Sequence, residues 1–104
     1  MADAYKTLYQ GQLPNSVATL VTVSGGKSWI VKSIEFVNVT AASVSFQIFR
    51  NGTTSAFQTE SGTIPANGLA QWDGQIGMAA GEYFAGVASS ATAINVLISG
   101  DEVS

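Results

Sequence analysis

The chain has 104 residues, the length of a single domain. Charged residues make up only 11% of it and the formal net charge is −3 at pH 7, so its four basic side chains are too few for a nucleic-acid-binding surface. Cysteine and histidine are absent, which excludes disulfide bonds, a thiolate nucleophile, a Cys/His zinc site and imidazole acid–base catalysis.

Short β-rich runs separated by turn residues follow one another along the chain, a pattern typical of an antiparallel β-sandwich. No window has the 3.6-residue period of a helix, so we expect almost no helix. The sequence predicts one all-β domain over residues 1–104, a sandwich of jelly-roll or immunoglobulin-like type with seven to nine short strands. The strands are expected at residues 5–10, 17–23, 28–39, 43–50, 55–60, 69–73 with 75–78, 82–88 and 92–99.

Local features refine these strands. Apolar residues occur on both faces of the third strand, which predicts a β-bulge near Lys32 and Ser33. Asn51-Gly52 follows the fourth strand and predicts a type I′ hairpin turn, because both residues tolerate positive φ. Gly74 interrupts the sixth run, which is expected to form two short strands or one bent strand. At the N-terminus we expect residues 1–5 to form a flexible arm, with simple fraying as the alternative.

The outward-facing positions of the expected strands carry few charges. Phe49, Phe84, Val39 and Leu97 fall on that parity beside small Ser, Thr and Ala residues, so a monomer would expose an apolar surface. Such a surface is typical of a contact site and predicts a homo-oligomer or a domain docked on a larger assembly. Burial of these side chains within one chain is the alternative. The residues predicted to contact a partner are Tyr5, Tyr9, Phe49, Trp72 and Phe84.

The aromatic residues among these candidates have distinct settings. Tyr5 and Tyr9 share one parity of the first strand, and tyrosine is enriched at interfaces. Trp72 lies in a polar, turn-like stretch and is expected to be partly exposed, where it could stack on a sugar. Trp29 begins a strand and is expected to cap the core. For both tryptophans, packing at the core or its rim is favoured over a ligand platform.

Residues that could support catalysis are sparse. Glu60, Asp73 and Glu82 are candidate carboxylates for glycoside chemistry, but Asp73 and Glu82 adjoin turn glycines, which favours a turn role. A serine nucleophile would have to pair with a lysine, since histidine is absent, and no G-x-S-x-G motif is present. We therefore predict that the chain is not an enzyme.

Metal, phosphate, glycan and membrane signals are equally weak. Calcium would need clustered oxygen ligands, and neither Asp73 nor Asp101-Glu102 lies in a D-x-D-x-D pattern, so no metal or cofactor is expected. The segment 25–28 is interpreted as a hairpin turn, because a phosphate loop needs an upstream glycine and a following helix. Sequons begin at Asn38 and Asn51, but no secretory signal precedes them. No run approaches the roughly 20 apolar residues of a membrane span, and no membrane association is expected.

A set of motifs distributed along the chain resembles a known group of proteins. They are Leu8-Tyr9-Gln10-Gly11-Gln12-Leu13-Pro14, Val17-Ala18-Thr19-Leu20, Gly25-Gly26-Lys27-Ser28, Val31-Lys32-Ser33-Ile34, Val37-Asn38-Val39-Thr40, Trp72-Asp73-Gly74, Met78-Ala79-Ala80-Gly81-Glu82 and Ile98-Ser99-Gly100. Together they resemble small β-rich proteins from the structural gene modules of tailed bacteriophages. The resemblance covers nearly the whole chain. It is a pattern of turns and strand starts and transfers no catalytic residue.

The resemblance implies a virion structural protein made in the cytoplasm of a host bacterium. The function it favours is that of a capsid decoration, or cement, protein, which binds the assembled head as an oligomer and stabilises it. A trimer is the favoured oligomer, and the partner would be the major capsid protein or another virion protein. The alternatives are a receptor- or carbohydrate-binding module of a tail or head fibre, and a neck or tail component.

Overall fold

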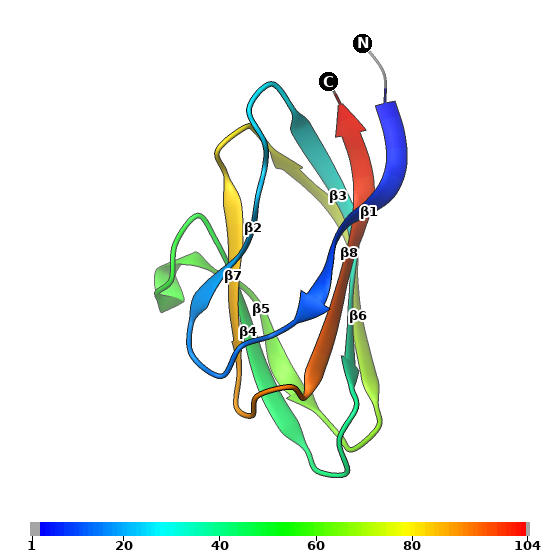
Figure 1. Ribbon diagram of the computed structural model, residues 1–104, viewed down its shortest axis with the longest axis vertical. Helices are drawn as coiled ribbons and strands as arrows, with labels where there is room; N and C mark the ends of the chain where they lie inside the picture. The colour runs from blue at the N-terminus through cyan, green and yellow to red at the C-terminus, as the bar shows by residue number, and fades with distance from the viewer. Residues whose placement is uncertain (1–2, 104) are drawn as a thin grey trace.

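The computed structural model describes residues 3–103, and this part of the chain forms eight strands in two antiparallel sheets packed face to face (Figure 1). One sheet has the strand order β1-β8-β3-β6 and is called the β1 sheet here. The other has the order β2-β7-β4-β5 and is called the β2 sheet. The strands are β1 (Asp3–Gln12), β2 (Ala18–Thr22), β3 (Ser28–Asn38), β4 (Val44–Arg50), β5 (Gln58–Ile64), β6 (Leu69–Met78), β7 (Tyr83–Ala88) and β8 (Ile94–Val103).

This strand order defines the topology as an eight-stranded jelly roll, in which two Greek keys fold into a double sheet. The predicted all-β sandwich is confirmed, and eight strands lie within the expected range. An immunoglobulin-like domain would divide its strands as ABED and CFG, so that alternative is not the topology formed. The described residues contain one short 3₁₀ turn, η1 (Ser55–Phe57), and no helix of the length and apolarity needed to cross a membrane.

The core lies between the two sheets and is built largely from inward-facing residues of β3, β4, β7 and β8. Phe36 of β3 stacks on Phe46 of β4 across the sandwich, with ring centroids 4.3 Å apart. Each fully buried aliphatic or aromatic side chain contributes about 1.5–3 kcal/mol relative to an exposed one. The core cluster consists of Leu13, Val23, Trp29, Val31, Ile34, Phe36, Val44, Phe46, Ile48, Ile64, Met78, Phe84, Ala88, Ala93, Ile94, Val96 and Ile98.

The β-bulge predicted near Lys32 is confirmed. Strand β3 changes register against both β6 and β8 between Val31 and Ser33. Beside this bulge the β3 backbone comes so close to β8 that a Cβ on Gly100 would overlap the carbonyl oxygen of Ile30 and lie 2.9 Å from the Val31 Cα. Glycine is therefore the residue that fits this position.

The hairpin turn predicted at Asn51-Gly52 is wrong. Asn51 has a positive φ of 62°, but Gly52 is not among the residues with positive φ, and the chain continues through a loop into η1. The fifth strand therefore begins at Gln58 and not at residue 55. The local turn signal is overridden by a contact distant in sequence, because the Asn51 side chain forms hydrogen bonds with the turn before β7.

The first strand begins within the segment predicted to form an arm. Residues 1–2 of the predicted flexible arm lie outside the described residues, whereas Asp3 and Tyr5 belong to β1 and pair with Val103 and Asp101 of β8. The sixth run forms one continuous strand, β6, across Gly74. The start of β1 and the end of β8 therefore lie at the same end of the sandwich, at the top of Figure 1.

Candidate functional site

Strand β7 places Phe84 in the core, which corrects its predicted outward orientation. Phe84 is fully buried and belongs to the core cluster. Gly86 shares its parity, and a Cβ there would lie 2.8 Å from Leu13 and 3.0 Å from Ile48, so this side of β7 packs closely against the interior. Phe84 is therefore inaccessible to a partner in the folded chain.

Phe49 faces away from the core, as the alternation of β4 predicts, but it is also buried. Ile48 belongs to the core cluster, whereas Phe49 pairs with Ala85 and both are buried outside that cluster. The loop 51–57 follows directly, its η1 turn contacts β4, and Figure 1 shows it on the outer side of the sheet beside β7. Phe49 is therefore inaccessible to a partner in the folded chain, which corrects the exposed contact expected there.

The two predicted tyrosine contacts point in different directions. Strand β1 has a register shift between Thr7 and Tyr9, and this bulge reverses the parity of the residues after it. Tyr5 consequently remains 64% exposed, whereas Tyr9 pairs with Ile98 and packs against the core. Of the five predicted contact residues, Tyr5 is the one that the structure leaves most accessible.

Neither tryptophan forms a free platform. Trp72 lies in the edge strand β6, is half-buried and packs against the core. Its ring also lies over Gly74, because a Cβ there would be 2.7 Å from the Trp72 ring. Trp29 is 5% exposed and closes one end of the core, in agreement with its predicted capping position.

Ion pairs surround the C-terminal end of β8. The Trp29 indole N–H donates to Glu102 Oε2 at 3.1 Å, and Lys6 Nζ lies 3.2 Å from Glu102 Oε1. Lys32 Nζ lies 3.1 Å from Asp101 Oδ2. The hydrogen bonds from Trp29 and Lys6 hold the pKa of the Glu102 carboxyl below its ordinary value. Asp101 and Glu102, two of the three carboxylates considered as calcium ligands, are thus engaged by neighbouring side chains.

Both carboxylate oxygens of Glu82 accept hydrogen bonds at the turn before β7. Its Oε1 accepts a hydrogen bond from the Ala79 N–H at 2.6 Å, and its Oε2 accepts one from Asn51 Nδ2 at 2.6 Å. Asn51 in turn accepts a hydrogen bond from the Tyr83 N–H through Oδ1 at 3.0 Å. The Ala79 N–H and the Asn51 amide lower the pKa of the Glu82 carboxyl. These bonds also hold Asn51 in its left-handed conformation.

The three carboxylates considered for catalysis are not brought together. Glu60 lies in β5 of one sheet and Asp73 in β6 of the other, and Glu82 lies in the β6–β7 turn. Asp73 Oδ1 accepts a hydrogen bond from Gln71, and Glu60 Oε1 accepts one from the Ser61 N–H. Across residues 3–103, no three acidic side chains are grouped so as to hold a metal ion.

Asn38, the start of one sequon, is 1% exposed. Its Nδ2 donates to the carbonyl oxygens of Ala42, Ile64 and Pro65 at 2.8–3.2 Å. Its Oδ1 accepts hydrogen bonds from the N–H and hydroxyl of Thr40. Because the amide nitrogen is buried and bonded, it is not accessible to a glycosylating enzyme in the folded chain.

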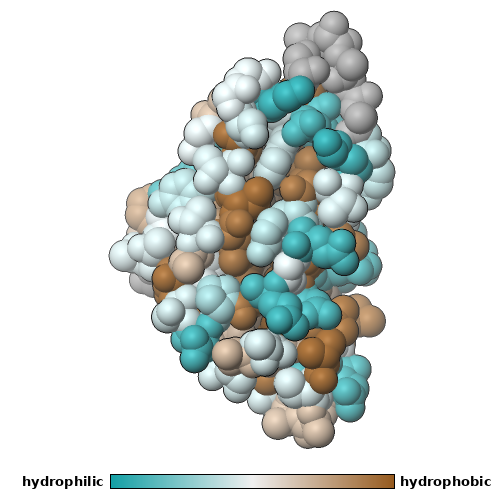
Figure 2. Space-filling model, in the orientation of Figure 1, coloured by the Kyte–Doolittle hydropathy of each residue, from teal (hydrophilic) through white to brown (hydrophobic). Residues whose placement is uncertain are grey.

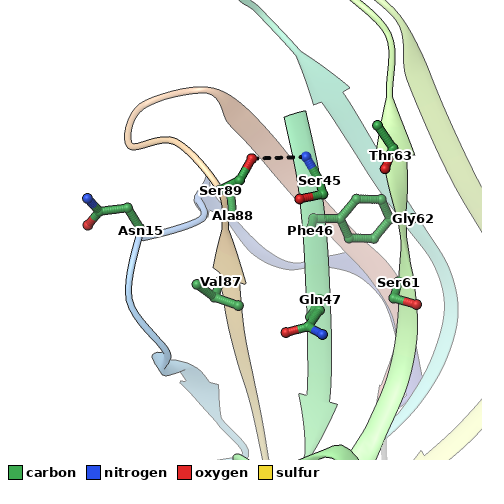
Figure 3. A pocket seen from close by; sticks show the side chains of 10 residues that line it. All are labelled: Asn15, Ser45, Phe46, Gln47, Ser61, Gly62, Thr63, Val87, Ala88 and Ser89. Atoms are coloured by element: carbon green, nitrogen blue, oxygen red, sulfur yellow. Dashed lines mark hydrogen bonds between the residues drawn. The ribbon is translucent and has the colours of Figure 1, made fainter. Parts of the chain in front are cut away.

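The outer face of the β2 sheet carries a shallow hollow of about 570 Å³, which sequence reasoning did not predict (Figure 3). At its edge the Ser45 N–H of β4 donates to Oγ of Ser89, the residue that follows β7, at 3.1 Å. Gln47 donates to Gln58 at 3.2 Å beside it. The residues that line it are Asn15, Ser45, Phe46, Gln47, Ser61, Gly62, Thr63, Val87, Ala88 and Ser89, and none is charged.

The hollow belongs to a sheet face without charged side chains. Ile48 and Gly86 point inward, so the strand register assigns the alternate residues of β4, β5 and β7 to the outside. Glu60 pairs with Ile48 and so has inward parity. The sequence signal for this face is the run of small or polar residues at alternate positions. The outward residues are Ser45, Gln47, Phe49, Gln58, Ser61, Thr63, Tyr83, Ala85 and Val87.

Comparison with known proteins finds matches among solved structures. No family model and no curated protein matches the chain. The solved structure of the Tobacco streak virus coat protein is similar over 94% of this chain and 84% of that chain, with 8% sequence identity and a TM-score of 0.49. At this identity and score, the likeness assigns no function to the chain.

Proposed function

We propose that the chain is a structural protein of a tailed-bacteriophage virion that decorates the capsid and stabilises it as an oligomer, with a trimer favoured. Its partner is the major capsid protein or another virion protein, and it is made in the cytoplasm of the host bacterium. The phage-like motifs from residue 8 to residue 100 support the class of protein. The jelly roll also supports it, since viral capsid domains commonly use this fold.

The observation that carries the proposal is the uncharged outer face of the β2 sheet. About a quarter of the residues in a typical domain are charged, and an ordinary solvent-facing sheet surface includes many of them. Interface cores, in contrast, are depleted of charged residues. The face around Gln47 and Val87 has the composition of a contact surface. Tyr5, on the other sheet, adds an exposed aromatic contact.

Decoration stabilises a shell by mass action. A protein that binds the assembled head and not its dissociated subunits shifts the equilibrium toward assembly. An oligomer that contacts several capsid subunits at once gains avidity, because each further contact is intramolecular. Modest individual contacts are therefore sufficient for firm attachment.

The test uses heads from a phage mutant that lacks this gene. Purified protein is added, the heads are pelleted, and their resistance to heat and osmotic shock is measured. We expect the protein to pellet with the heads and to raise the temperature at which they release DNA. Heads that remain equally fragile, with the protein left in the supernatant, would contradict the proposal.

A second candidate function is a carbohydrate-binding module of a fibre, which the neutral hollow favours. Lectin domains also use the jelly roll, and the hydroxyl and amide groups of Ser45, Gln47 and Thr63 can bond to sugar hydroxyls. A glycan array tests this function, with Gln47→Ala expected to weaken binding and Trp72→Ala expected to leave it unchanged. Absence of binding to any host-surface glycan contradicts it.

A further inference from the structure

The connections at one end of the jelly roll contain no charged residue. Successive antiparallel strands place every second connection at the same end, so the β1–β2, β3–β4, β5–β6 and β7–β8 connections meet there. These are residues 13–17, 39–43, 65–68 and 89–93, which we call the neutral tip. All of them are described, and none is Asp, Glu, Lys or Arg. In Figure 1 the tip is at the lower end, opposite the two termini.

Charged side chains lie at and near the opposite end, whereas Glu35, Glu60 and Asp73 lie within strands between the two ends. Lys27 lies in the β2–β3 turn and Glu82 in the β6–β7 turn. Lys6 and Lys32 pair with Glu102 and Asp101 in the adjoining part of the β1 sheet. The two ends of this 45 Å molecule therefore differ, because charged side chains lie at and near one end and none lies in the connections at the other.

Apolar side chains are exposed on and beside the neutral tip. Val17 is 43% exposed and Val39 is 47% exposed, and Leu69, which directly follows the tip, is 66% exposed. Exposed alanines lie between them, including Ala42 and Ala66. In Figure 2 the lower end of the molecule is largely white, tan and brown. An apolar, uncharged surface can be removed from water at little cost, unlike a charged one.

Hydrogen bonds join the tip loops into one rigid unit. The Val39 N–H donates to the Ala93 carbonyl at 2.9 Å, and the Asn67 N–H donates to the Thr40 carbonyl at 3.0 Å. The buried Asn38 amide bonds to carbonyl oxygens on both sides of this junction. The Ala88 N–H bonds to the Pro14 carbonyl at 2.8 Å. A surface fixed in this way loses little conformational entropy when it binds.

We propose that the neutral tip is the surface that docks on the capsid, against an uncharged protein surface of the assembled shell, with the charged end facing outward. This inference rests on the proposed function and assigns the attachment to one end of the molecule. A charged partner surface would lose its water on docking and find no opposite charge on the tip. The neutral face of the β2 sheet, which adjoins the tip at Ser89 and Asn15, then remains available to like subunits.

The test compares the same substitution at the two ends. Ala66→Glu and Val39→Glu place a carboxylate on the tip, and Ala80→Glu places one in the exposed β6–β7 turn at the other end. Circular dichroism and thermal melting confirm that each variant is folded, and binding to heads lacking the protein is measured by co-sedimentation. We expect both tip variants to lose affinity by at least about 100-fold, because docking would bury an unpaired charge, while Ala80→Glu binds normally.

The other possible outcomes contradict docking through the tip, the proposed function, or both. If wild-type protein and both tip variants bind heads equally, docking through the tip is wrong and the proposed function stands. If wild-type protein fails to bind heads, the proposed function fails and the inference fails with it. Loss of binding in Ala80→Glu alone assigns docking to the charged end. A wild-type self-association that disappears in Ala66→Glu assigns the tip to a second copy of the chain.

Binding of the wild-type protein to heads should also persist in about 1 M NaCl, where the Debye length is about 3 Å, because the neutral tip contains no charge to be screened.

Discussion

Asn38 shows how a single polar residue can organise one end of a β-sandwich. Its side chain is buried at the end of β3 and satisfies the carbonyl oxygens of Ala42, Ile64 and Pro65. These carbonyls belong to two different connections between the sheets, so one amide fixes the relative position of both. An apolar residue in its place would leave buried acceptors without donors.

We predict that Asn38→Ala lowers the free energy of unfolding by about 2–3 kcal/mol, the cost of leaving buried backbone acceptors unpaired. Denaturant unfolding followed by tryptophan fluorescence measures the change. Asn15→Ala is the matched control, because Asn15 is exposed in the β1–β2 loop, and it should change stability by less than about 0.5 kcal/mol. Equal effects of the two substitutions would refute the assigned role.

The hydrogen bonds that Glu82 accepts predict that the stability of the protein depends on pH. Its hydrogen bonds from Ala79 and Asn51 lower its pKa in the folded state, so folding favours the ionised form. The stabilisation is present above the unfolded-state pKa of about 4.3 and is lost as the pH falls through the lowered folded-state value. Melting temperatures of wild type and Glu82→Gln should differ at pH 7 and converge in acid. Parallel curves over the whole pH range contradict this prediction.

At the scale of elements, the contact between β3 and β8 depends on one glycine. The β3 bulge brings the Ile30 carbonyl against Gly100, where no side chain fits. Gly100→Ala should destabilise the protein by about 2–3 kcal/mol through overpacking against backbone atoms. Gly77→Ala in β6 is the control, since a Cβ there meets no atom within 4 Å, and it should be neutral or slightly stabilising. Urea unfolding measures the free energy of unfolding of both variants. An unchanged value for Gly100→Ala would contradict the close contact between β3 and β8.

Strand positions could be predicted from the sequence where one parity is clearly more apolar than the other. Strand β4 is such a case, and the bulge in β3 is visible because apolar residues change parity at Lys32. Strand β7 is not such a case, because Tyr83–Ala88 has apolar residues on both parities. The predicted outward orientation of Phe84 is therefore wrong. The β1 bulge leaves no such mark, so Tyr5 and Tyr9 could not be separated.

The arrangement of the strands and the surfaces depends on contacts distant in sequence. Local patterns do not distinguish a jelly roll from an immunoglobulin-like sandwich, since β1 pairs with β8 at the opposite end of the chain. Phe49 is buried although its parity is outward, and the conformation of Asn51 depends on Glu82. The neutral sheet face and the neutral tip also arise only when the register brings separate uncharged segments together.

At the scale of the whole molecule, the neutral face of the β2 sheet predicts an oligomer. Sedimentation equilibrium should give three times the monomer mass. Val87→Lys places a charge in the centre of that face and should yield a monomer that remains folded. Thr7→Lys, at an exposed position in β1 of the other sheet, is the control and should leave the oligomer intact. A wild-type monomer at all concentrations would contradict subunit contact through this face.

The most direct test of the central claim is the copy number of the chain in purified virions, measured by quantitative mass spectrometry against the major capsid protein. A decoration protein that binds throughout the shell should be present at a copy number comparable to that of the capsid protein. A few copies per particle would indicate a neck, tail or fibre component instead. Complete absence from the virion would contradict the proposal that this jelly roll is a structural protein of the particle.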